Sequence, residues 1–414
     1  MSGSRRRVVA TPQQQRRSII GTGAVLIALS GPGQTAGFSV FVDPLTENLD
    51  VSRGQLTFAY LLGTLAASTT GTWLGGVIDR RGVVRVVPGV ALGLCLATVL
   101  AAVSTHLVML TIAIYGLRSF GQTGMPLAAS VFVAKNVAHR RGAALGLLTA
   151  LGGSTIALTP FIAARVIPRI GWQATWILEG VVVVLMGLVM VWVIRRLRLE
   201  HPHADEQEIV DGSAATDEPR HLRRNGFLVV TFGYATTGFV STALAFHQIA
   251  VLGERGLSAA AAATNFLPQS LASALVALVV GRLVDRVPSR IVVPFSMLTL
   301  MVAVLSLSFV SSAVGAVGFG IALGSAAATM AASEGALLAR WIGRDTLGTW
   351  RGRMTSVMVI STAVAPFVFS LLADWAGSYT SATRLVVVLP VISGVIAIAT
   401  PLPSDRHRVR DTQA

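Results

Sequence analysis

Long apolar stretches recur along the whole chain, separated by short polar segments that carry most of the charged residues. A helix needs about 20 apolar residues to cross roughly 30 Å of hydrocarbon, whereas strands of a membrane barrel alternate polar and apolar residues. The apolar stretches here are continuous. The pattern therefore predicts an all-α membrane protein with twelve transmembrane helices, at residues 18–43, 54–78, 86–104, 108–134, 142–167, 172–194, 226–251, 258–281, 290–311, 313–338, 352–375 and 381–402.

One stretch interrupts this pattern in the middle of the chain. Residues 195–225 are rich in His, Asp and Glu and hold little that can build a core, which is typical of a polar linker. The linker separates six predicted helices from six. The predicted organisation is a cytoplasmic tail at 1–17, a six-helix bundle at 18–194, the linker at 195–225, a second bundle at 226–402 and a tail at 403–414.

The charge distribution predicts how the chain crosses the membrane. Charged residues make up only 13% of the 414, against about 25% in soluble domains, yet the net charge is +14. In a soluble protein this charge would suggest nucleic acid, but here the basic residues lie at helix ends, so we expect no nucleic-acid partner. Most of the Lys and Arg residues fall in one set of loops. The other set carries only Arg53, Arg165, Arg169, Arg255 and Arg384. By the positive-inside rule, both termini and the linker are predicted to be cytoplasmic, in the cell membrane.

The two halves repeat each other in sequence. Landmarks recur at a spacing of 206 residues: Asp79-Arg80 and Asp285-Arg286, Pro160 and Pro366, Gly171 and Gly377. Shared spacing across three separate landmarks indicates a duplication of six helices in parallel orientation.

The segment from Gly75 to Arg85 resembles the loop between helices 2 and 3 of the major facilitator superfamily, and the second copy departs from it at Pro288. The resemblance covers the whole chain. It implies the major facilitator fold, with two six-helix bundles rocking about a central site. It also implies a cytoplasmic gate, in which Asp79 docks at the start of helix 11 and Asp285 at the start of helix 5. The residues predicted for this gate are Asp79, Arg80, Asp285, Arg286, Arg141 and Arg351. The alternative is that these loops are only charged stop signals.

Within that superfamily, helix 1 is similar to the monocarboxylate transporter and oxalate:formate antiporter branch. The resemblance rests on Gly31 to Thr35 with Phe38 and Phe41, and on the segment from Phe132 to Gly146. It implies an organic anion as substrate. The chain departs from the animal monocarboxylate transporters in helix 8, where their Asp and Arg correspond roughly to Gln269 and Ser273.

Arg118 is the sharpest candidate for binding such an anion. A charge at mid-bilayer costs at least about 2.5–3.5 kcal/mol, so Arg118 must face protein, a ligand or a wet cavity. By resemblance its helix borders the cavity, and Gln122 is expected one turn away on the same face. The alternative is a structural arginine bonded to backbone carbonyls of helix 1.

Further polar residues inside predicted helices complete the candidate site. The predicted substrate-binding set is Arg118, Gln34, Gln122, His247, Asn265 and Gln269. His247 and Glu334 are candidates for proton coupling, because His titrates near neutral pH and Glu334 lies on a cavity helix. The alternatives are a core histidine, an ion pair of Glu334 with Arg340 or Arg353, and polar helix contacts for Asn265 and Gln269. The Gly320–Gly324 spacing predicts close helix packing.

These features predict a secondary transporter of a small organic solute, driven by a gradient. We find no phosphate-binding loop to drive primary transport and no catalytic cluster of an enzyme. No cofactor and no metal are expected; the partners are the small-molecule substrate and the lipid bilayer, and the chain is expected to be a monomer. Two alternatives stay open: a proton-coupled drug or metabolite efflux transporter, although helix 5 lacks a Gly-Pro motif, and a transporter-shaped sensor.

Overall fold

The computed structural model describes residues 12–137, 141–197, 199, 219–341 and 344–403. Within these residues every regular element is a helix. Nine helices there are long and apolar enough to cross a membrane by length and composition. Many large apolar side chains are exposed, such as Leu96, Trp192 and Val279, as expected for surfaces that face lipid.

The first half contains six passes. Its elements are α1 (Pro12–Ala28), the 3-10 turn η1 (Gly31–Gly33), α2 (Thr35–Ser39), α3 (Val42–Leu49), α4 (Arg53–Ala67), α5 (Thr70–Arg81), α6 (Val83–Ala102), α7 (Leu107–Gly116), the π-helix η2 (Leu117–Gly124), α8 (Met125–Asn136), α9 (Arg141–Ile156), α10 (Leu158–Ile170) and α11 (Trp172–Leu197). Several passes are thus built from two or more consecutive elements.

The second half also contains six passes. Its elements are α12 (Arg220–Phe246), α13 (Gln248–Gly253), α14 (Ala259–Thr264), α15 (Phe266–Leu283), η3 (Val284–Arg286), α16 (Ser289–Ser306), η4 (Leu307–Phe309), α17 (Ala313–Trp341), α18 (Arg344–Ala376), α19 (Tyr379–Val386) and α20 (Val388–Ala399). The predicted twelve-helix architecture is confirmed, and each half has its own buried apolar core.

Two passes differ from the uniform helices that hydropathy predicts. The first, predicted as one helix at 18–43, is broken between Ala28 and Thr35, because Pro32 supplies no backbone N–H and two glycines flank it. It then continues as α3 to Leu49. The fourth, predicted at 108–134, contains the π-helix η2 in its centre.

Two helix boundaries also differ from the predicted ones. Helix 11, predicted from residue 352, begins at Arg344, and its added turns place Trp350 edge-on against Phe227 of α12, with ring centroids 4.6 Å apart. The predicted linker, 195–225, has helical ends, since α11 runs to Leu197 and α12 starts at Arg220. Residues 200–218 of the linker, and residues 1–11 and 404–414 of the tails, lie outside the described residues.

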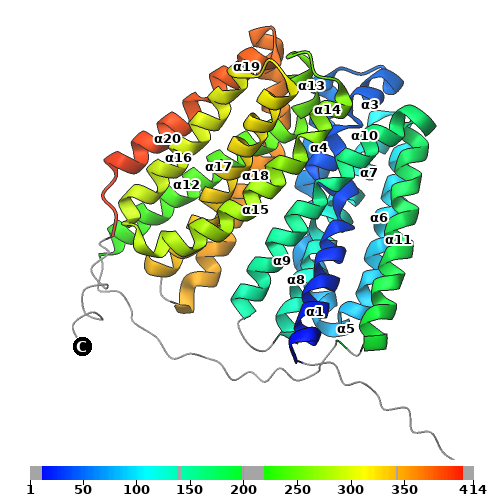
Figure 1. Ribbon diagram of the computed structural model, residues 1–414, viewed down its shortest axis with the longest axis horizontal. Coiled ribbons are helices and arrows are strands. Elements are labelled where there is room, and N and C mark those ends of the chain that lie inside the picture. Colours follow the sequence, from blue (N-terminus) through cyan, green and yellow to red (C-terminus); the bar gives the residue numbers. More distant parts are fainter. Residues whose placement is uncertain (1–11, 138–140, 198, 200–218, 342–343, 404–414) are drawn as a thin grey trace, which may run out of the picture.

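The halves lie side by side, with α1 to α11 on the right of Figure 1 and most of the second half on the left. They meet where α4 packs against α18, and where α9 and α10 pack against α14 and α15. In Figure 1, α1 begins and α11 ends at the lower edge.

The backbone supports the duplication. Gly171 and Gly377, one predicted pair, both have positive φ, 83° and 76°, and each ends a helix at the same place in its half. The same 206-residue spacing relates Asp50 and Gly256, which also have positive φ. The two halves therefore share their turns as well as their sequence landmarks.

Candidate substrate site and the contact between the halves

The break in the first pass brings its backbone against the fourth pass. A Cβ on Gly33 would overlap the carbonyl oxygen of Leu117 and lie 2.6 Å from Cα of Gly121. A Cβ on Gly31 would overlap the hydroxyl of Thr159 in the fifth pass. Only glycine permits such an approach, so the Gly31-Pro32-Gly33 turn fits tightly between two neighbouring passes.

Arg118 lies at this crossing, on η2, with 2% of its surface exposed. Its Nη1 donates to the carbonyl oxygen of Gly33 at 3.0 Å and to the hydroxyl of Thr35 at 3.3 Å. Its guanidinium carbon lies 5.1 Å from the ring centroid of Tyr60. One bond therefore goes to a helix 1 carbonyl, as the structural alternative expects, but this accounts for Nη1 only.

The other edge of the guanidinium has no partner. Nε and Nη2 of Arg118 are buried from solvent and make no hydrogen bond. Among the described residues no carboxylate pairs with Arg118; an ion pair joins Arg53 to Asp43 instead. A buried charge without a partner is costly, and Nε with Nη2 is an edge that a carboxylate can bind with two parallel hydrogen bonds. Arg118 is thus structural on one side and unsatisfied on the other.

Tyr60 and Thr35 complete the surroundings of Arg118, and neither was among the predicted site residues. Tyr60, on α4, is fully buried, and its hydroxyl lies 3.0 Å from the hydroxyl of Thr35. Phe38 packs on the Tyr60 ring with centroids 5.2 Å apart. A tyrosine in an apolar stretch resembles any core aromatic, so the sequence carries no signal that sets Tyr60 apart.

Two predicted glutamines lie near this crossing. Gln34 follows the Gly31-Pro32-Gly33 turn and donates from Nε2 to the Ser30 hydroxyl at 2.9 Å, which braces the break. Gln122 is half-buried on η2, and it is not among the polar contacts of Arg118. Because η2 is a π-helix with i→i+5 bonds, four residues cover slightly less than one turn, and that Gln122 shares a face with Arg118 stays a prediction.

His247 lies away from Arg118, at the junction of α12 and α13. Its Nε2 donates to the carbonyl oxygen of Pro366 at 3.0 Å, and its Nδ1 is buried without a partner. The ring stacks on Tyr379 with centroids 4.9 Å apart. No polar contact links His247 to Arg118 in the described part of the chain, so these two predicted site residues are not brought together.

Asn265 and Gln269 face α17. The side chain of Asn265 occupies the space where Gly320 would have a Cβ, and the Gln269 carbonyl oxygen does the same at Gly324. The close packing predicted for the Gly320–Gly324 spacing is thus confirmed. Both polar atoms of the Asn265 side chain and Oε1 of Gln269 are buried without hydrogen bonds. The pair lies in the second half, away from the contacts of Arg118.

The predicted gate residues are only partly described. Of these, Arg80 and Arg286 are exposed. Glu334, predicted for proton coupling and not for the gate, is buried on α17. The backbone places Asp79 in α5, Arg141 at the start of α9, Asp285 in η3 and Arg351 within α18. Arg351 was expected at a helix start, and this was wrong, because α18 begins seven positions earlier at Arg344. The side chains of these four residues lie outside the described part.

At one end of the molecule, which we call the closed end, the halves are in contact. Phe246, from α12, packs edge-on against Tyr60 at 4.7 Å between centroids and against Phe38 at 5.7 Å. The hydroxyls of Thr57 and Ser370 lie 3.0 Å apart, joining α4 to α18. These contacts form an aromatic and polar seal across the two halves.

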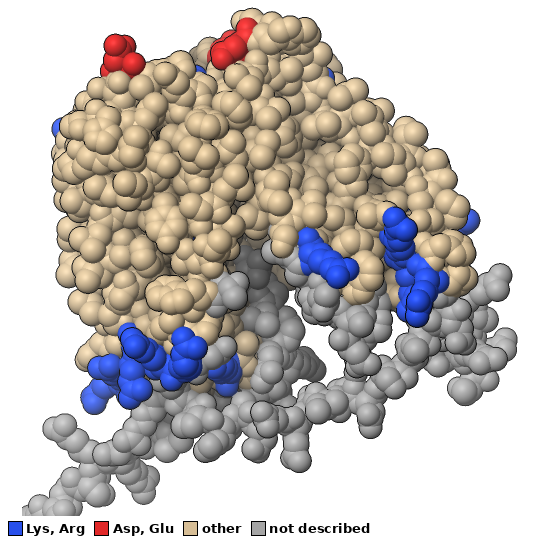
Figure 2. All heavy atoms as spheres, turned by 180° about the vertical axis from the view of Figure 1, so that it is seen from behind, with Lys and Arg blue, Asp and Glu red and all other residues tan. Residues whose placement is uncertain are grey.

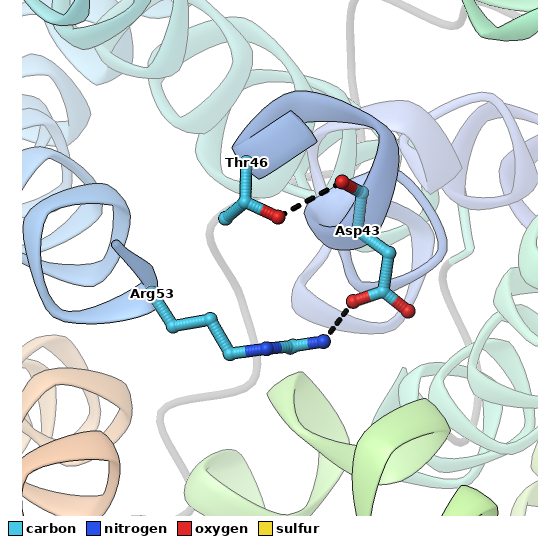
Figure 3. Close-up of polar contacts among 3 residues, drawn as sticks. All are labelled: Asp43, Thr46 and Arg53. Carbon is cyan, nitrogen blue, oxygen red and sulfur yellow. Dashed lines mark hydrogen bonds and ion pairs between the residues drawn. The ribbon is translucent and has the colours of Figure 1, made fainter. Parts of the chain in front are cut away.

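Charged side chains reinforce the closed end. Arg53, at the start of α4, pairs with the carboxylate of Asp43, whose backbone carbonyl accepts a bond from the Thr46 hydroxyl at 2.8 Å (Figure 3). The Arg53 guanidinium lies 5.7 Å from the ring centroid of Tyr379 in the second half. Arg165 of the fifth pass donates to the Thr264 hydroxyl at 2.8 Å, again between the halves.

The opposite end is hollowed on the face that Figure 2 draws. Figure 2 shows that the surface is hollowed between two groups of Lys and Arg side chains at the lower edge, while Asp and Glu side chains lie at the upper edge. Contacts at one end and a hollow at the other are the geometry of one state in an alternating-access cycle.

Comparison with known proteins agrees with this geometry. The sequence profile of the Major Facilitator Superfamily matches residues 23–268 and 228–414. No curated protein matches the chain.

Solved structures with the same fold include a bacterial homolog to the human lysosomal transporter Spinster in an inward-facing and occupied conformation. It has a TM-score of 0.71 and 14% identity over 92% of this chain and 96% of that one. The same homolog in an inward-facing and unoccupied conformation has a TM-score of 0.69 and 14% identity, over 94% and 97% of the two chains. At this identity the likeness establishes the fold alone. The profile match spans nearly the whole chain, so the protein belongs to the Major Facilitator Superfamily of membrane transporters.

Proposed function

We propose that this secondary transporter carries a small organic anion, such as a monocarboxylate, and that Arg118 binds its carboxylate. The observation that carries the proposal is the unsatisfied Nε and Nη2 edge of Arg118, which is buried and has no carboxylate partner among the residues that the structure describes. The other candidate anion-binding groups around it are neutral: Thr35, Tyr60 and Gln34. A single cation with neutral surroundings favours one negative charge on the substrate over two.

The branch resemblance in helix 1 supports the same substrate class. The turn Gly31-Pro32-Gly33 that carries it is also the turn that gives Arg118 its backbone partner. Asn265 and Gln269 are proposed to contact the rest of the substrate, because both polar atoms of the Asn265 amide and Oε1 of Gln269 are buried without partners in this conformation.

Binding in detergent solution tests the proposal. A ligand at about 100 times its Kd stabilises the folded state by about 2.7 kcal/mol, which a melting curve detects. We expect a panel of monocarboxylates to raise the melting temperature of the wild type and not of Arg118→Gln. Stabilisation by hydrophobic cations, with none by carboxylates, would instead favour the efflux alternative.

We infer that the hollow end is cytoplasmic, so that the conformation is inward-open. The concentration of Lys and Arg at that end supports this under the positive-inside rule. A cysteine at Ser213, in a Cys95→Ser background, should resist an impermeant thiol reagent in whole cells. Rapid labelling there would reverse the orientation.

For the cytoplasmic gate we keep the roles that the superfamily resemblance implies for Asp79, Asp285 and their basic partners. In an inward-open state this gate is parted, so its contacts form only in the opposite state. Asp79→Asn should slow transport and leave substrate binding intact, because it weakens one conformation without touching the site. Unchanged transport in a variant that also carries Asp285→Asn would remove the support for these roles.

We propose His247, in preference to Glu334, as the residue that couples transport to protons. Its Nδ1 is sealed in the closed end, beside Tyr379 and near Arg53, so a proton reaches it only after that end opens. His247→Gln should then flatten the pH dependence of uptake between about pH 5 and 8, where His ordinarily titrates. A pH profile equal to that of the wild type would exclude this role.

A further inference from the structure

The Tyr60 side chain contacts both Arg118 and the second half of the molecule. Its ring lies 5.1 Å from the guanidinium carbon of Arg118 and 4.7 Å from the ring of Phe246. Phe246 comes from α12, yet it is buried within the apolar core of the first half. A movement of Tyr60 therefore changes the seal between the halves at the same time as it changes the surroundings of the cation.

The Tyr60 ring also accounts for how Arg118 tolerates burial without an anion. The ring is fully buried, and an aromatic face attracts a cation most strongly where water is excluded. The free Nε and Nη2 have no contact with solvent in this conformation. A carboxylate can reach that edge only after neighbouring groups move, and the ring beside the guanidinium is the neighbour that links to the seal.

The hydroxyl of Tyr60 ties the same two features together. It shares a hydrogen bond with the Thr35 hydroxyl, which itself accepts a bond from Arg118 Nη1. The ring is therefore fixed at one end by the polar cluster around Arg118 and at its edge by Phe246. When a carboxylate neutralises the guanidinium, the attraction between Arg118 and the ring weakens, because it depends on the positive charge.

We propose that Tyr60 is a positioning residue that couples anion binding at Arg118 to opening of the closed end. In the present conformation the ring rests against the cation and holds Phe246 in the first half. A carboxylate on the Nε and Nη2 edge displaces the ring, and Phe246 is released. The identity of the ligand rests on the proposed function, whereas the coupling of Arg118, Tyr60 and Phe246 does not.

The second half offers a matched control. At the 206-residue spacing, Phe266 corresponds to Tyr60 and Gly324 corresponds to Arg118. Phe266 is a buried ring on the corresponding pass, with 3% of its surface exposed, and it faces no cation at the corresponding position. Truncating Phe266 therefore measures the effect of losing a buried ring alone.

Opening is measured at Ser370, which is buried against Thr57 across the seal. Ser370→Cys in a Cys95→Ser background is treated in whole cells with an impermeant maleimide. We expect Tyr60→Leu to be labelled about tenfold faster than the parent, as loss of a buried cation–π contact implies. Tyr60→Phe keeps the ring, so it should stay much closer to the parent, and Phe266→Leu should stay within about twofold. Equal acceleration in Tyr60→Leu and Phe266→Leu would overturn the proposal.

Arg118→Gln separates coupling from packing. It removes the charge that holds the ring, so it should also speed labelling, but it should add little in a Tyr60→Leu background. Additive effects of the two substitutions on the labelling rate would contradict the coupling. An unchanged labelling rate in Arg118→Gln alone would also contradict it, and this result can be obtained even if Tyr60→Leu fails to fold.

Lactate, pyruvate and benzoate serve as probes of the ligand step. A probe that binds should speed labelling of the parent and not of Tyr60→Leu. If a probe binds without changing the labelling of the parent, the coupling proposal is wrong. If none of the three stabilises the wild-type protein, the monocarboxylate function fails, while the Arg118 and Tyr60 comparison still decides the coupling.

Discussion

The two halves of the molecule share their frame and differ at their centre. Ser52 and Ser258 cap the second helix of each half, and Pro88 and Pro294 both lie inside the third, at a constant spacing of 206 residues. Phe41 and His247 correspond as well, and each directly precedes a short helix, α3 or α13, with nearly the same backbone, at φ −98° and −96°. Duplication has therefore preserved where the chain turns.

The centre of the fourth pass in each half is different. Arg118 lies in the π-helix η2, and its counterpart Gly324 lies in the uninterrupted helix α17. The turn that supplies Arg118 with a carbonyl contains Gly33, and the counterpart of Gly33 is Phe239, inside the continuous helix α12. At equivalent positions of the shared frame, the first half thus carries a candidate binding residue and the second half carries tight helix packing. The proposed substrate binding is therefore centred in the first half.

The largest expected effect comes from the backbone crossing that exists only in the first half. Gly33→Ala should destabilise the protein by about 3 kcal/mol or more, because the new methyl group meets backbone atoms that cannot rotate away. Gly89→Ala, where a Cβ meets nothing within 4 Å, is the control and should leave stability almost unchanged. Unfolding in mixed detergent measures both; a well-folded, stable Gly33→Ala protein would exclude the tight crossing.

The shared frame predicts paired effects of the next size. Gly171 has φ 83° and ψ 160°, a region that is almost exclusive to glycine, and Gly377 has φ 76°. Replacing either with Ala should cost about 1–3 kcal/mol, and by similar amounts in the two halves. The same unfolding assay measures the difference, and a large effect in only one half would show that the two turns are not equivalent.

The smallest effect concerns the helix caps. The Ser52 hydroxyl accepts a hydrogen bond from the backbone N–H of Gln55, and the Gln55 side chain accepts one from the backbone N–H of Ser52. The Ser258 hydroxyl accepts a bond from the backbone N–H of Ala261, which has no side chain that could return one. Ser52→Ala should therefore cost about 1 kcal/mol and Ser258→Ala somewhat less. In a Gln55→Ala background, the free-energy cost of Ser52→Ala should fall to that of Ser258→Ala. If Gln55→Ala has no effect on its own, the reciprocal cap does not contribute.

The architecture could be predicted from the sequence because the length of an apolar stretch is a property of a whole segment. Hydropathy located all twelve passes, and the landmarks at Gly171 and Gly377 revealed the duplication. The break at Gly31 to Gly33 lies within an apolar stretch, and hydropathy averaged over 20 residues does not detect a turn of three.

The centre of the site was less predictable for a related reason. A π-helix and an α-helix differ by one residue in each hydrogen bond, and packing against the glycine turn, rather than the sequence of η2, distinguishes them. Arg118 stood out because a charge in an apolar segment is expensive. Tyr60 did not, since its importance arises from two neighbours that are distant in the sequence, Arg118 and Phe246.

The central claim is that Arg118 binds a carboxylate through its free edge, and Arg118→Lys tests it most directly. Lysine keeps the charge and loses the planar fork that binds two oxygens at once. Binding isotherms for a monocarboxylate that stabilises the wild type, beside melting curves without ligand, give affinity and folding separately. We predict an affinity at least about tenfold weaker in Arg118→Lys, with a ligand-free melting temperature close to that of the wild type. A folded Arg118→Lys protein with wild-type affinity would contradict the account.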